Sequence, residues 1–135
     1  MTRLPGWQRR FADLVRARSQ AAFAWGQFDC VLWAADAVQA LTGTDLAASM
    51  RGAYTNAAEA AHLLRQHGGI QQLPGQHLCP KPVACAQVGD VGLYAAAHRP
   101  TLVVCGGAHW LAAAPLGLAL IPAAQVSHAW SAAHA

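Results

Sequence analysis

Charged side chains are scarce in this 135-residue chain, where they make up 11% of the residues, against about 25% in a usual soluble domain. Long apolar runs are also missing. The longest candidate, residues 111–124, is interrupted by Pro115, Gly117 and Pro122, so we expect no membrane-spanning helix. Arg3 is not followed by an apolar stretch of the signal-peptide type, and we expect no secretory signal. Such an uncharged, alanine-rich surface suggests that partner proteins cover much of the exterior.

The few positive charges gather near the N-terminus, in a segment expected to form a helix over residues 5–19. The apolar side chains of this segment fall on one helical face: they are Trp7, Phe11, Leu14 and Val15. The positive side chains around them are Arg3, Arg9, Arg10, Arg16 and Arg18. Because no interleaved aromatic platform accompanies the arginines, we expect them to face solvent or a partner protein and not a nucleic acid.

The four cysteines do not suggest a disulfide framework, because the absence of a secretory signal predicts a reducing site of synthesis. His77, Cys79 and Cys85 form a His-x-Cys-x5-Cys pattern that could bind zinc or join an iron–sulfur site. The gap between the two cysteines is longer than the usual spacing, however, and a fourth ligand is not identified. We therefore expect ordinary loop cysteines and no bound metal, and keep a small metal-binding adaptor as an alternative.

The order of the expected elements predicts an α+β domain spanning residues 1–135, with N-terminal helices packed on one side of a C-terminal antiparallel sheet. A second helix is expected over residues 30–42 and a third from Asn56 to about His67, the second being apolar on most sides and therefore central. Strands are expected over residues 91–96, 101–105, 108–113 and 116–121. Gly106-Gly107 suits a hairpin turn, and residues 125–130 form a terminal segment docked by Val126 and Trp130.

Cys30 stands at the expected start of the central helix, directly after Asp29, which is a natural N-cap. The positive end of a helix dipole favours a thiolate over a thiol, so this position can activate a cysteine. Cysteine is also a small apolar residue that is often buried, and an inert structural role remains the alternative.

Three segments carry a resemblance to a known family. Residues 23–30 end in Asp-Cys at a helix start, residues 87–94 contain a Gly-Asp before a strand, and residues 102–107 form a strand that ends in glycine. In their order and spacing they resemble the NlpC-type cell-wall peptidases, a branch of the papain-like cysteine peptidases. More specifically, they resemble a short branch of that superfamily found in phage tail-tip gene clusters.

The resemblance implies a papain-like fold with Cys30 in the position of the nucleophile. In such a site a thiolate attacks a peptide carbonyl, and a histidine carries the proton. Here the position of the base falls on Pro100 or Thr101, and that of its orienting group near Leu111 or Ala112. These residues cannot perform those roles.

Two histidines lie close in the sequence to the position of the base, and either His98 or His109 would have to serve in its place. Trp25, Phe28 and Asp29 would border a substrate groove; the alternative for the two aromatic residues is a place in the core.

We therefore expect a structural component of a phage tail tip, located in the virion, that has a degenerate peptidase site. Its implied partners are the tail hub and central tip proteins, and no cofactor is implied. The main alternative is an active peptidoglycan endopeptidase that opens the cell wall during DNA delivery. The metal-binding alternative is a small tail adaptor.

Overall fold

The structure, a computed structural model, describes residues 1–95 and 99–133. Its helices are α1 (Trp7–Arg18), α2 (Cys30–Thr42) and α3 (Ala57–Gln66). The strands are β1 (Cys79–Lys81), β2 (Val91–Ala95), β3 (Pro100–Cys105), β4 (Trp110–Ala113), β5 (Leu118–Ile121) and β6 (Val126–Ser131). The short 3₁₀ helices are η1 (Pro74–Gln76), η2 (Val83–Cys85) and η3 (Ala123–Gln125). The α+β class predicted from the sequence is confirmed.

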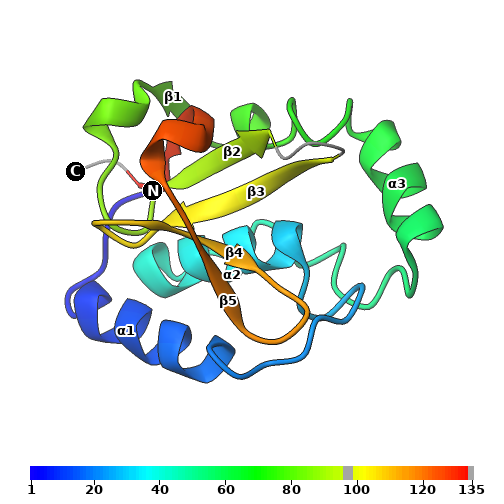
Figure 1. Ribbon diagram of the computed structural model, residues 1–135, viewed down its shortest axis with the longest axis horizontal. Coiled ribbons are helices and arrows are strands. Elements are labelled where there is room, and N and C mark those ends of the chain that lie inside the picture. Colours follow the sequence, from blue (N-terminus) through cyan, green and yellow to red (C-terminus); the bar gives the residue numbers. More distant parts are fainter. Residues whose placement is uncertain (96–98, 134–135) are drawn as a thin grey trace.

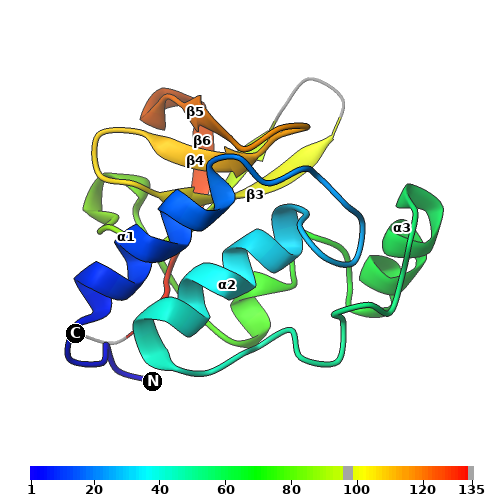
Figure 2. The same ribbon diagram turned by 90° about the horizontal axis from the view of Figure 1, so that it is seen from below.

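All described strands join one antiparallel sheet in the order β1-β6-β2-β3-β4-β5. The helix α2 packs against β3 and β4, and α1 packs along α2 (Figure 1). The helix α3 lies apart from α1, beyond the N-terminal end of α2 (Figure 1). The view from below shows the same separation (Figure 2). Within the described residues, no helix has the length and apolar character needed to cross a membrane.

The ends of α2 lie where the sequence predicts them. The side chain of Asp29 accepts a hydrogen bond from the backbone N–H of Leu32, and Gly43 ends the helix with a φ of 80°. The helix α3 begins in the same way, because Asn56 accepts a hydrogen bond from the N–H of Glu59. The side chain of Glu59 in turn accepts one from the N–H of Thr55. Local capping therefore fixes the start of both helices.

The central position of α2 follows from its composition. Leu32, Trp33, Val38 and Leu41 are fully buried or nearly so. The indole Nε1 of Trp33 donates to the backbone oxygen of Leu111 on β4 over 2.9 Å, which ties α2 to the sheet through a satisfied buried donor.

Two strands were not predicted. The strand β6 was expected to be only a docked terminal segment, but it lies between β1 and β2 in the interior of the sheet. Val126 and Trp130 are buried, as expected, but the burial along β6 does not alternate, and its pairing with β2 shifts between Leu93 and Tyr94. The strand β1 has only three residues, one of which is Pro80. Such strands carry little periodic signal.

Asp90 connects both ends of the described chain. Its buried carboxylate accepts hydrogen bonds from Lys81 Nζ at 2.7 Å, from the N–H of Gln87 at 2.8 Å and from the N–H of Ala132 at 3.0 Å. Arg3 Nη2 lies 3.7 Å from the same carboxylate. One buried anion thus holds the N-terminal segment, β1 and the residue that follows β6.

Candidate functional site

Cys30 is the first residue of α2, and a tight loop precedes it. In this loop Ala24 and Phe28 exchange two backbone hydrogen bonds, of 2.9 Å and 2.8 Å, around Gly26. Gly26 has a φ of 81°, and a Cβ at this position would collide with the backbone oxygen of Tyr54. Only glycine fits this turn without strain, so the loop that presents Cys30 has a defined geometry.

Asp29 is occupied by structural contacts. It is 1% exposed, and its carboxylate accepts hydrogen bonds from the N–H of Gly26 at 2.9 Å, from the N–H of Leu32 at 3.0 Å and from the hydroxyl of Tyr54 at 2.6 Å. A carboxylate with three buried donors caps the helix and fixes the loop. It does not border a surface groove.

The thiol of Cys30 is not activated by its place at the helix start. Its pKa is raised to about 11, mainly because the sulfur of this half-buried residue is desolvated; a backbone hydrogen bond from Leu102 opposes the shift, and the nearby charge of Asp29 adds to it. Desolvation and the anionic cap beside the thiol thus act against the thiolate that the positive end of a helix would favour.

The structure does not bring His109 to this thiol. The hydrogen bond with Leu102 places the sulfur near the start of β3, whereas His109 follows the other end of that strand. There its backbone oxygen accepts from the N–H of Gly106 at 2.8 Å. The strand from Leu102 to Cys105 is itself about 10 Å long, so His109, which follows Cys105, lies well away from the thiol. His109 is an exposed residue of the loop between β3 and β4, one residue before the strand on which it was expected.

The other candidate base, His98, lies outside the described residues. Pro100 and Thr101, which occupy the position of the family's base, are half-buried residues of β3. Neither can accept a proton from a thiol.

The two aromatic residues near Cys30 have different surroundings. Phe28 is buried and meets the ring of Trp33 edge-on, with the centroids 6.4 Å apart, so it belongs to the core. Trp25 is half-buried, and its ring meets that of Phe23 edge-on at 4.8 Å. The guanidinium carbon of Arg99, just before β3, lies 5.9 Å from the Trp25 ring centroid. Of the predicted groove residues, Trp25 is the one that reaches the surface.

His77, Cys79 and Cys85 are not gathered into a metal site. Cys79 lies on β1 and Cys85 ends η2, and both are exposed free thiols. His77 lies beside a cavity described below. Among residues 1–95 and 99–133, no group of three or more His, Cys, Asp or Glu side chains is arranged to hold a metal ion.

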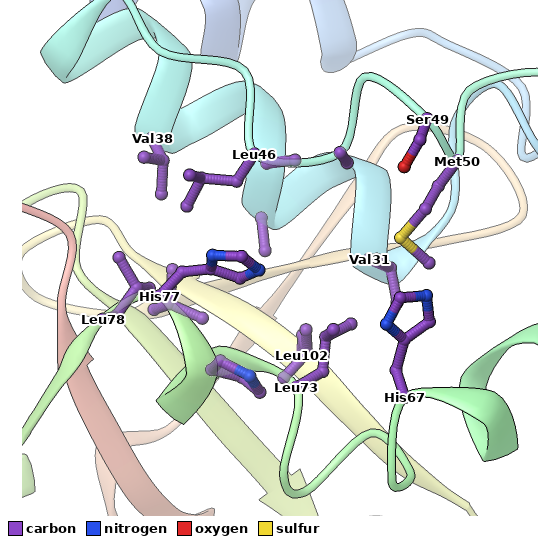
Figure 3. A pocket seen from close by; sticks show the side chains of 15 residues that line it. Val31, Val38, Leu46, Ser49, Met50, His67, Leu73, His77, Leu78 and Leu102 are labelled. Atoms are coloured by element: carbon purple, nitrogen blue, oxygen red, sulfur yellow. The ribbon is translucent and has the colours of Figure 1, made fainter.

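A cavity of about 230 Å³, which the sequence does not predict, lies between α2 and the segments 46–50 and 67–78 (Figure 3). One face of α2 lines it with Val31, Ala34, Ala35 and Val38. These positions follow the helical spacing i, i+3, i+4 and i+7. One feature of the sequence points to this cavity: α2 is apolar on most sides, and α1 and the sheet together cover only some of them.

A family model described as a domain of unknown function (DUF6950) matches residues 2–132. The chain belongs to the DUF6950 family. No curated protein and no solved structure matches the chain significantly.

The DUF6950 match covers both Cys30 with its cap and the cavity below α2. Both features therefore lie within the unit that defines the family.

Proposed function

We propose that this protein is a structural component of a phage tail tip, built on an NlpC-type, papain-like fold with a cysteine site that does not catalyse. The segments that carry the resemblance support this assignment through their positions. Residues 23–30 end at the start of α2, residues 87–94 enter β2, and residues 102–107 include the end of β3.

The observation that carries the proposal is the state of the Cys30 thiol. A cysteine peptidase needs a thiolate and a base that receives the proton. Because its pKa is raised to about 11, the Cys30 thiol is almost entirely protonated at pH 7. Two features raise this pKa, the desolvation of the thiol and the negative charge of its neighbour Asp29. A catalytic cysteine is instead activated by partial exposure and by nearby positive charge.

The surface supports a role in assembly. Residues 100–133 contain no Asp, Glu, Lys or Arg. Leu116 and Leu120, at the hairpin of β4 and β5, are 74% and 64% exposed. Exposed leucines on an uncharged sheet edge suit contact with other proteins, which here would be the tail hub and central tip proteins. The site of action would be the tail tip of the virion.

The alternative function, an active peptidoglycan endopeptidase, is tested with purified cell walls. We expect the wild-type protein and the Cys30→Ser variant to release the same background amount of soluble fragments. A His98→Ala variant should match them, with Cys85→Ser as a control for the loss of an exposed thiol. Wall cleavage that the wild type performs and Cys30→Ser does not would contradict the proposal.

The structural role is tested in the phage that carries this gene. Deletion of the gene should give particles with defective tails. Supplying the gene for the Cys30→Ser variant should restore normal tails and normal titre. Normal infectious particles in the absence of the gene would exclude a required tail component.

A further inference from the structure

We propose that the cavity between α2 and the segment 67–78 binds a small amphipathic carboxylate, with its apolar body inside and its carboxylate at the mouth. This inference is independent of the proposed tail-tip role and of Cys30, which is not among the cavity-lining residues.

The interior of the cavity is apolar and stands open because two small residues face it. Ala34 and Ala35 lie on the cavity face of α2, where larger side chains would fill the space. Val91 and Leu102, from β2 and β3, close the floor and are almost fully buried. An engineered apolar cavity of about 150 Å³ holds one benzene molecule. In proportion, a volume of about 230 Å³ accepts an apolar body of about nine non-hydrogen atoms.

The mouth carries hydrogen-bonding groups from two sides. The imidazole of His67, just after α3, lies beside Met50, and the imidazole of His77, just after η1, points toward Leu46 (Figure 3). Ser49 adds a hydroxyl on the side of Met50. Among the described residues, neither imidazole ring forms a hydrogen bond with another side chain or with the backbone. Each ring therefore offers an N–H donor to a ligand at the mouth.

The surrounding charges favour an anion over a cation. No Asp or Glu lines the cavity. Asp45, which precedes the lining residue Leu46, accepts hydrogen bonds from Arg51 at 2.8 Å and 3.1 Å. Asp36, on α2, forms ion pairs with both Arg51 and Arg18. Because these carboxylates are neutralised by arginines, the mouth presents donors without an opposing negative charge.

Octanoate is a suitable probe, compared with octanol and octylamine as neutral and cationic molecules of the same length. Each compound is titrated into the full chain at neutral pH, below its critical micelle concentration or solubility limit. Binding is followed by the NMR chemical shifts of the backbone amides. We expect saturable binding of one octanoate, with shifts concentrated at Val31, Ala35 and Leu102. Octylamine should bind at least about tenfold more weakly.

Two pairs of variants separate the body of the ligand from its head group. Ala35→Phe fills the cavity and should weaken octanoate binding at least about tenfold, whereas Ala40→Phe, on the side of α2 that faces Arg10 and Asp13, should not. The double variant His67→Ala/His77→Ala should weaken octanoate binding and leave octanol binding unchanged, with His62→Ala as the control on α3.

Several results would overturn the proposal. These are equal binding of octanoate and octylamine, unchanged binding by a folded Ala35→Phe variant, and no saturable binding to the wild type. If Ala35→Phe does not fold, the wild-type shift map decides, because shifts distributed away from the cavity-lining residues would also contradict the proposal.

Discussion

The hydroxyl of Tyr54 donates a 2.6 Å hydrogen bond to the carboxylate of Asp29, and both groups are buried. This bond joins the loop before α2 to a segment 25 residues later in the chain. Burial, followed by the bond and charge of Asp29, raises the pKa of Tyr54. The phenol therefore stays protonated and remains a permanent donor to the helix cap.

Removal of this donor should destabilise the fold. In Tyr54→Phe, Asp29 keeps its charge and burial but loses its shortest hydrogen bond, so the free energy of unfolding should fall by about 1.5–3 kcal/mol. Urea denaturation at neutral pH measures this loss. The matched control is Tyr94→Phe, on the half-buried part of β2, which should change stability by less than about 0.5 kcal/mol. Equal effects of the two variants would show that the Asp29 contact has no special role.

The raised pKa of Cys30 predicts low reactivity toward alkylating reagents. At pH 7.5, iodoacetamide should modify the exposed Cys79 and Cys85 well before Cys30, because the thiolate is the reactive species. The rate at Cys30 should continue to rise with pH toward about 11. Peptide mapping by mass spectrometry measures each site separately. Rapid labelling of Cys30 near neutral pH would instead indicate an activated nucleophile.

The same shift predicts a loss of stability in alkali. The pKa of Cys30 rises from its ordinary value of 9.0 to about 11 on folding, so over this interval the folded state holds a proton that the unfolded state releases. Stability is fully present below pH 9 and declines as the pH rises toward 11. Cys30→Ala should make this decline shallower, as measured by denaturant unfolding at a series of pH values. Cys85→Ala, at an exposed thiol, should leave the slope unchanged.

Neutralisation of Asp90 should be more damaging than neutralisation of an exposed acid. Asp90→Asn keeps the size of the side chain but leaves Lys81 and Arg3 beside an uncharged amide. A loss of about 3–5 kcal/mol is expected for a broken buried pair. Asp13→Asn, which removes ion pairs between exposed side chains on α1, should cost less than about 1 kcal/mol. Thermal or urea unfolding of the two variants makes the comparison.

The parts of the fold that the sequence predicts correctly depend on neighbouring residues. Asp29 and Gly43 mark the two ends of α2, and Asn56 marks the start of α3, because capping is a local interaction. The β3–β4 hairpin is of the same kind, since its turn contains Gly106 and Gly107.

The features that the sequence did not predict depend on distant residues. The strand β6 enters the sheet between β1 and β2 through pairings such as Pro80 with Trp130 and Val91 with Trp130. No pattern within β6 itself specifies those partners.

The candidate site shows the same division. Asp29 could be recognised as a cap, but its burial and its third donor, Tyr54, depend on residues distant in the sequence. The cavity beneath α2 also required the whole fold, because its lining combines one face of a helix with loops and strands that are distant in the sequence. The pKa of a thiol and the volume of a cavity are properties of the packed molecule.

Asp90 lies where a mechanical load on the molecule would arrive from both ends. Arg3 and Ala132 approach the same carboxylate from the two ends of the described chain. Next to these contacts, the N–H of Leu4 donates to the backbone oxygen of Leu41 at the end of α2, and β6 pairs with β1 and β2. A pulling force between the ends would therefore load the Asp90 contacts together with α2 and the sheet.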